Sequence, residues 1–175
     1  MWIGYYEGMI ASDTLLKTTL PDLTFSDSLW IDGTKTNIKL LECKNGHTGS
    51  DLILLLPKEG IIFMGDLLFV NRHPWSEDGS PESWPQHLQR LEKDKMYSQY
   101  VPGHGPVGGN QEMKLMINYL KDVPQLVRLG IEKNQPDSVI IKTPIAEAYK
   151  DWWFGNFYQP NVSFLCAELG KNKTH

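Results

Sequence analysis

The chain has 175 residues and a formal net charge of −4, and 41% of its residues are hydrophobic and 22% charged. This length suits one domain with a sizeable core, and the composition excludes a disordered chain and a coiled coil. The acidic balance without a basic run argues against a nucleic-acid partner, and no apolar run approaches the ~20 residues that a membrane helix needs.

The start of the sequence and its cysteines indicate the compartment. The first residues, MWIGYYEG, lack the positive segment and apolar segment of a signal peptide. The two cysteines, Cys43 and Cys166, are far apart in the sequence, so a disulfide framework is not expected. A cytoplasmic location in a reducing environment is therefore predicted.

The first half of the chain has the pattern of a sheet. Residues 1–22 form a lead segment of weak pattern, in which Ser12 or Asp13 offers the cap of a helix. The runs LTFSDSLWI and KTNIKLLEC flank an Asp-Gly turn, which predicts a hairpin. Residues 51–56 and 61–64 are apolar without alternation, as in strands that are covered on both faces.

The second half has mainly helical patterns. A helix is expected to start near residues 80–83, and YSQYV predicts a short strand that ends in the Gly/Pro loop PGHGPVGG. A long helix follows, and Pro124 is expected to kink or break it. Another helix is expected over 138–151, and a last one is expected in NVSFLCAELG, with Asn161 as a possible cap and Gly170 as the stop. The pattern predicts a mixed α/β domain.

Three polar residues stand beside predicted strands: His47 in GHTGSD, Asp66 in MGDLLF and His104 in PGHGPVG. Imidazoles and a carboxylate are the ligands of Zn²⁺, Mn²⁺ or Fe²⁺ sites, and loops at strand ends can direct several of them to one point. Taken singly, each has an ordinary interpretation as a surface histidine or a turn aspartate. Their joint occurrence, in order and with flanking glycines, favours the metal interpretation.

The stretch GHTGSDLILLLPKEGIIFMGDLLF, followed by VPGHGPVGG, closely resembles the metallo-β-lactamase superfamily. The resemblance implies that His47, Asp66 and His104 are metal ligands, with Asp66 as the carboxylate shared between two metals and as the catalytic residue. It implies half of an αββα sandwich over 23–110 and, over 111–175, the C-terminal helical extension of one hydrolase branch. FVNRHPW resembles a loop of that branch, which implies that His73 and Trp75 line the mouth of the substrate pocket.

The His-x-His-x-Asp-His motif of this family is absent from the sequence. No two of the five histidines are two positions apart; they are His47, His73, His87, His104 and His175. Each metal would keep one histidine and a share of Asp66, whereas a catalytic zinc normally has three protein ligands. The resemblance therefore implies a truncated metal-dependent hydrolase, acting on an ester, thioester, lactone or β-lactam, whose isolated chain has little activity and binds zinc, manganese or iron weakly.

Half of a sandwich also exposes an apolar sheet face, which costs free energy in water at ~25 cal/mol per Å². We expect a two-fold homodimer through this face, whereas the lead segment 1–22 is too short to cover a whole sheet. The alternative to a hydrolase is a non-catalytic half-domain that acts as a self-associating assembly or binding module. The aromatic run DWWFGNFY over 151–158 has two interpretations. It could be a substrate lid or an interface anchor, but the favoured interpretation is that it packs the C-terminal helices onto the sheet.

Overall fold

One mixed sheet organises the chain in the computed structural model, which describes residues 2–12 and 19–171. Its five strands lie in sequence order: β1 (Ser28–Asp32), β2 (Asn37–Lys44), β3 (Ser50–Leu56), β4 (Ile61–Phe69) and β5 (Gln99–His104). The first four pair antiparallel, and β5 runs parallel to β4. The hairpin at the Asp-Gly turn and the two apolar strands are therefore confirmed, and together with the helices the fold class is α+β.

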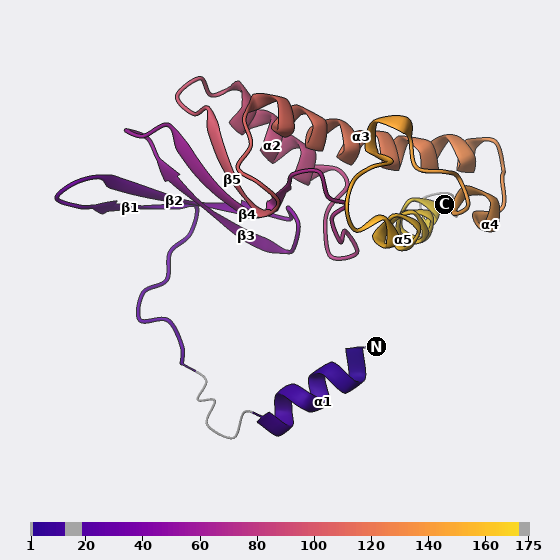
Figure 1. Ribbon diagram of the computed structural model, residues 1–175, viewed down its shortest axis with the longest axis horizontal. Coiled ribbons are helices and arrows are strands. Elements are labelled where there is room, and N and C mark those ends of the chain that lie inside the picture. The colour runs from indigo at the N-terminus through magenta and orange to yellow at the C-terminus, as the bar shows by residue number, and fades with distance from the viewer. Residues whose placement is uncertain (1, 13–18, 172–175) are drawn as a thin grey trace.

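Four helices of the described residues come after β4 in the chain, and the first two of them cover one face of the sheet. They are α2 (Ser83–Lys93), α3 (Asn110–Glu132), α4 (Asp137–Ile140) and α5 (Tyr158–Gly170), with single 3-10 turns at Glu147–Tyr149 and Gly155–Phe157. Figure 1 shows α2 and α3 lying together along one side of the sheet. Helix α2 makes the crossover between the parallel strands β4 and β5, as such strands require. No helix in the described part of the chain is both long enough and apolar enough to span a membrane.

Helix α1 (Trp2–Ser12) precedes the sheet, and Figure 1 shows it apart from the rest of the molecule. Its apolar side chains Ile3 and Ile10 are exposed. Ser12 is its last residue, and Asp13, the other proposed cap of a later helix, lies outside the described residues. In this structure the described part of the lead segment does not cover the sheet.

The two faces of the sheet differ sharply in burial. The covered face carries Ile53, Ile62 and Met64, all fully buried against the helices. On the opposite face Leu52 and Phe63 keep 50% and 43% of their surface exposed. None of the other apolar residues of that face is fully buried: Leu29, Ile31, Ile38, Leu40, Leu54, Leu56, Ile61 and Val101. In the described residues, then, strands expected to be covered on both faces are covered on one.

Several expected helical details were wrong. The break expected at Pro124 is wrong, because α3 continues through it to Glu132, while the kink stays a prediction. Residues 138–151 hold only α4 and a 3-10 turn, because Pro144 lacks a backbone N–H and disfavours helical backbone at the residue before it. Asn161 is not a helix cap. It lies buried within α5, where its amide donates to the Pro74 carbonyl at 2.7 Å.

Candidate metal centre

The turn between β2 and β3 positions His47 and is held by polar contacts within it. The Asn45 amide donates to the Gly49 carbonyl at 3.0 Å, with Asn45 in the left-handed region that asparagine tolerates. The Thr48 amide and hydroxyl both donate to the Asp51 carboxylate, at 3.1 and 3.0 Å. The backbone on both sides of His47 is therefore fixed.

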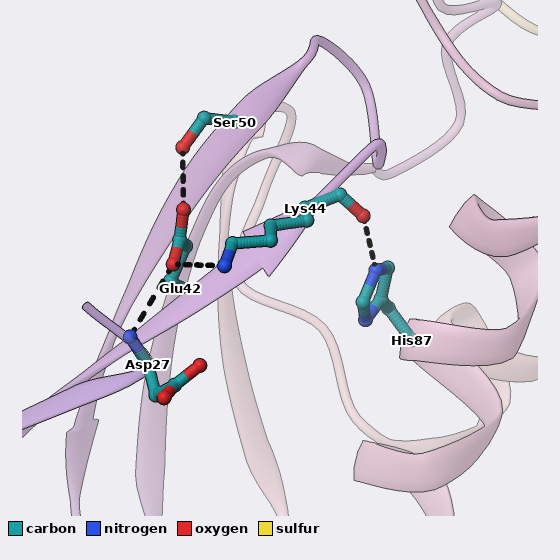
Figure 2. Close-up of polar contacts among 5 residues, drawn as sticks. All are labelled: Asp27, Glu42, Lys44, Ser50 and His87. Atoms are coloured by element: carbon teal, nitrogen blue, oxygen red, sulfur yellow. Dashed lines mark hydrogen bonds and ion pairs between the residues drawn. The ribbon is translucent and has the colours of Figure 1, made fainter.

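The strands that flank this turn are joined by a second polar group, shown in Figure 2. The Glu42 carboxylate accepts hydrogen bonds from the Ser50 hydroxyl at 3.2 Å and the Asp27 amide at 3.3 Å, and it pairs with Lys44 at 3.4 Å. Although desolvation opposes ionisation, these contacts hold the pKa of Glu42 below its usual value. His87 on α2 contacts the Lys44 carbonyl at 2.8 Å, so the end of β2 is linked to the helix layer.

The His47 ring lies on two aromatic side chains. Its centroid is 5.8 Å from that of Phe69 and 5.2 Å from that of Trp84, which it meets edge to face. The Trp84 indole is itself fixed, since its N–H donates to the Leu67 carbonyl at 2.9 Å. Strand β4 and helix α2 thus orient the imidazole that β2 and β3 present.

Asp66 and His104 form the closest pair of the three predicted ligands. Asp66 Oδ1 lies 3.5 Å from His104 Nε2, and the two side chains are 44% and 45% exposed. Both residues lie within strands, β4 and β5, rather than in the loops that the sequence predicted. Register shifts on either side of Gly65 interrupt the regular pairing here, and such irregularity re-aims side chains at a sheet edge.

Glycine at position 103 allows this pair to form. A Cβ atom on Gly103 would overlap Asp66 Oδ1 and lie 2.9 Å from the Gly65 carbonyl oxygen. Gly105, the residue after His104, has φ of +111°, which side-chain-bearing residues rarely adopt. The glycines that flank His104 therefore serve a close approach and a turn.

Phe69 connects the two histidines. Its ring stacks on His104 with centroids 4.9 Å apart and an interplanar angle of 18°, while its other neighbour is His47. The two predicted imidazole ligands therefore contact the same buried phenylalanine, and Asp66 lies beside one of them, His104. Even so, across residues 2–12 and 19–171 no group of three or more His, Cys, Asp or Glu side chains is arranged to hold a metal ion.

Known proteins match part of this chain in sequence and in fold. No family model matches the chain. A curated metallo-β-lactamase type 2 from Bacteroides fragilis is 28% identical over 96 residues, covering 53% of this chain and 39% of that protein. A solved metallo-β-lactamase from Pontibacter korlensis superposes with a TM-score of 0.53 at 25% identity, covering 65% of this chain and 54% of the other. This chain has the fold of the metallo-β-lactamase superfamily.

A second structural likeness reaches into the C-terminal helices. An inverting sec-alkylsulfatase from Pseudomonas sp. superposes with a TM-score of 0.64 at 12% identity and covers 85% of this chain, although only 26% of the sulfatase. A match of that extent must include a good part of 111–175, and at this identity it is a likeness of fold alone. The chain spans 39% of the length of the curated metallo-β-lactamase that it matches.

The spacing of the Asp66–His104 pair is that of an ion pair and is also compatible with two ligands of one metal. Two donors bonded to one tetrahedral zinc at ~2.0–2.2 Å lie roughly 3.4 Å apart, close to the 3.5 Å between Asp66 Oδ1 and His104 Nε2. Both side chains are open enough to accept further ligands from outside. Two imidazoles and one carboxylate are suitable donors for zinc but too few for two metals, so the metal itself remains a proposal.

His73 and Trp75 lie in the segment between β4 and α2. His73 is fully buried, and its Nδ1 lies 3.1 Å from the Tyr119 hydroxyl. Burial lowers the pKa of His73 below its ordinary value. Trp75 packs edge to face on Phe157 at 5.4 Å. Both residues thus contact the C-terminal helical region, and their assignment to substrate binding stays a prediction.

Three residues of this centre were not singled out from the sequence: Asp51, Phe69 and Trp84. Asp51 lies within the quoted motif GHTGSD, and its place three residues after Thr48 is the spacing of a local side-chain hydrogen bond, which is a readable signal. Phe69 and Trp84 act through ring contacts across the fold, for which local pattern carries no signal. Phe154 belongs to the aromatic run that the sequence did single out, and it approaches His104 from the far end of the chain.

Proposed function

We propose that this chain supplies one side of the metal site of a metal-dependent hydrolase that acts on an ester, thioester, lactone or β-lactam. The observation that carries the proposal is the 3.5 Å pair of Asp66 and His104, with His47 placed across Phe69 from His104. Bound zinc, or manganese or iron, would lower the pKa of a water molecule and polarise the bond to be cleaved.

The residues of the chain have separate roles in this proposal. His47 and His104 present neutral ring nitrogens as ligands, and Asp66 presents a carboxylate that two metals can share. Phe69, buried between the two imidazoles, keeps water from one side of both rings. The remaining ligands come from outside the described residues, so we expect the chain alone to bind zinc weakly and to hydrolyse little.

Zinc titration by calorimetry tests this proposal. We expect a weak signal that Asp66→Asn and His104→Gln each remove. His87→Gln is the matched control, because His87 is a half-buried histidine on α2 whose contact is a backbone carbonyl. Zinc binding that survives both site substitutions would overturn the assignment, and so would robust zinc-dependent hydrolysis by the isolated chain that Asp66→Ala leaves intact.

The open sheet face favours a second candidate, a non-catalytic half-domain that self-associates. Leu52 and Phe63 lie on this face at half exposure, on the adjacent strands β3 and β4. A second copy, related by a two-fold axis, would bury the same apolar side chains of both chains. Because such a contact replaces a core, its area should be on the order of 2,000 Å² or more in total.

Sedimentation equilibrium at micromolar concentration tests the dimer. We expect a two-fold dimer that Leu52→Glu with Phe63→Lys converts to a monomer. Val139→Lys is the matched control, since Val139 on α4 has the same 50% exposure as Leu52 but lies outside the sheet. A wild-type monomer at this concentration would refute the homodimer without bearing on the metal ligands.

The cytoplasmic location is also a proposal. Cys43 and Cys166 are both buried and free in the structure, which accords with a reducing compartment.

A further inference from the structure

Phe154 has a backbone conformation that its side chain disfavours. Its φ of 64° and ψ of 32° lie in the left-handed region. Glycine and asparagine adopt this region readily, whereas a bulky aromatic residue there is an outlier. Such conformations persist only where surrounding structure imposes them, and they concentrate at functional sites.

The residue that precedes Phe154 is held firmly by the surrounding structure. The Trp153 amide donates to the Asn71 carbonyl at 3.0 Å, and the His73 amide donates to the Trp153 carbonyl at 2.9 Å, so this segment pairs with the chain that leaves β4. The Arg72 guanidinium lies 5.8 Å from the Trp153 ring centroid, and its Nη1 donates to the Val70 carbonyl at 2.9 Å. Trp153 is thereby fixed on both its backbone and its ring.

The strained backbone brings the Phe154 ring to the candidate metal centre. The ring meets His104 edge to face at a centroid distance of 6.1 Å, and Phe157 lies 5.5 Å from Phe154 on another side. Since Phe69 stacks on His104 as well, this imidazole is flanked by aromatic rings from β4 and from the C-terminal segment.

Packing of the C-terminal helices does not account for this arrangement. It does account for Trp152 and Tyr158, the buried members of the aromatic run, which pack around His73. Trp153 and Phe154, in contrast, remain 69% and 36% exposed. The Trp153 ring therefore lies mostly in solvent, and the Phe154 ring, which contacts His104, still has 36% of its surface open to solvent.

We propose that the Phe154 ring beside His104, with the exposed ring of its sequence neighbour Trp153, forms an apolar subsite that binds the hydrocarbon or aromatic part of the substrate. This inference rests on the proposed hydrolase function and narrows its substrate to acyl compounds with a ring or an extended apolar chain next to the cleaved bond. Apolar walls beside a few polar groups are the usual construction of a small-molecule site, and ring-to-ring contact with Phe154 supplies the selectivity.

Substitution of Phe154 by glycine separates binding from structure. Glycine adopts the left-handed conformation without strain, so Phe154→Gly removes the ring and leaves the backbone where it is. A merely structural ring would lower the thermal midpoint when removed. If the ring is held there to bind substrate, its removal leaves the thermal midpoint unchanged or raises it, while substrate binding is lost. Phe25→Gly is the matched control, because Phe25 is also 36% exposed and lies before β1.

The experiment is an NMR titration of the chain with 3-phenylpropanoate and with acetate, followed at the amides of Gly105 and Gly155. Each titration is run once in EDTA and once with zinc. We expect 3-phenylpropanoate to shift these amides in both conditions and acetate to shift them only with zinc. Phe154→Gly should weaken 3-phenylpropanoate binding about two- to tenfold, the range expected for one aromatic pair, and Phe25→Gly should leave it unchanged.

The outcomes separate the two proposals. Binding of 3-phenylpropanoate that depends on Phe154 in EDTA, with no effect of zinc, supports the subsite and counts against the metal. Equal, zinc-dependent binding of both probes that ignores Phe154→Gly supports the metal and overturns the subsite. A Phe154→Gly variant with a lower thermal midpoint and unchanged binding also overturns the subsite, since it makes Phe154 a packing residue.

Discussion

Gly103 and Asp66 lie so close across the β4–β5 pair that a Cβ atom on Gly103 would overlap Asp66 Oδ1. Gly103→Ala must therefore displace either the carboxylate or the strand. We expect a loss of about 1–3 kcal/mol in the free energy of unfolding, the usual cost of forcing a methyl group into occupied space. Urea unfolding measures it.

Gly49→Ala is the control for this substitution, because a Cβ atom on Gly49 meets nothing within 4 Å. It should change the free energy of unfolding by no more than about 0.5 kcal/mol. If the two alanine variants were equally stable, the close approach of Gly103 to Asp66 would be wrong.

Leu52 and Ile53 are sequence neighbours on opposite faces of β3, so they test which face is covered. Ile53 is fully buried and Leu52 is 50% exposed. Ile53→Ala should cost about 2–5 kcal/mol through lost burial and a residual cavity. Leu52→Ala should cost about 0.5 kcal/mol in a monomer. Urea unfolding at several protein concentrations makes the comparison, and a large cost at Leu52 that grows with concentration would indicate that a second copy covers this face.

The pairing of the sheet could be predicted from the sequence because its signals are local. An Asp-Gly turn and two apolar runs joined by PKEG specify neighbouring antiparallel strands within a few residues. The residue types and order of His47, Asp66 and His104 could be recognised for the same reason. That Asp66 and His104 lie within strands could not, because it depends on the interrupted pairing around Gly65, which no local pattern reveals.

Features that depend on distant partners were beyond the sequence. Asn161 resembles a helix cap locally, but its side chain accepts from the Ser76 amide at 3.1 Å and donates to the Pro74 carbonyl, and both partners precede α2. The left-handed backbone of Phe154 likewise follows directly after Trp153, which pairs with the segment after β4. In both cases tertiary hydrogen bonds overrule the local preference of the residue.

Cys43 should be nearly inert in the folded chain. Burial raises the pKa of its thiol to about 11, and the nearby Asp51 carboxylate adds to the effect. Since the thiolate is the reactive form, the raised pKa alone should slow reaction with a disulfide reagent at pH 8 by about a hundredfold relative to the unfolded chain. The Cys166 thiol, whose pKa burial also raises, should behave similarly.

Absorbance of the released thiolate measures this reaction with and without denaturing urea, and Cys43→Ser isolates Cys166. If both thiols of the native chain reacted as fast as they do in urea, the burial of both residues would be contradicted.

His73 should make stability depend on pH in a defined direction. Burial lowers the pKa of His73 in the folded chain below its ordinary value of 6.5. Well above that value the imidazole is neutral in both states, and its full contribution to stability is present. As the pH falls through ~6.5, the unfolded chain takes up a proton that the folded chain resists, so the free energy of unfolding decreases until the lower, folded pKa is reached.

The variant His73→Asn tests this dependence. Asparagine keeps a polar atom near the Nδ1 site that faces the Tyr119 hydroxyl, but its side chain cannot titrate. We therefore expect His73→Asn to lower the urea midpoint by a similar amount at every pH and to remove part of the decline between pH 7.5 and 5. Both chains are measured in EDTA, so that metal binding does not contribute, and the difference between the two pH profiles isolates His73 from the carboxylates. An NMR titration of the His73 ring should show it still neutral at pH values where the unfolded chain is protonated. Parallel pH profiles for the two chains, or a His73 ring that titrates at or above 6.5, would mean that this imidazole is not held in the apolar, aromatic surroundings seen in the structure.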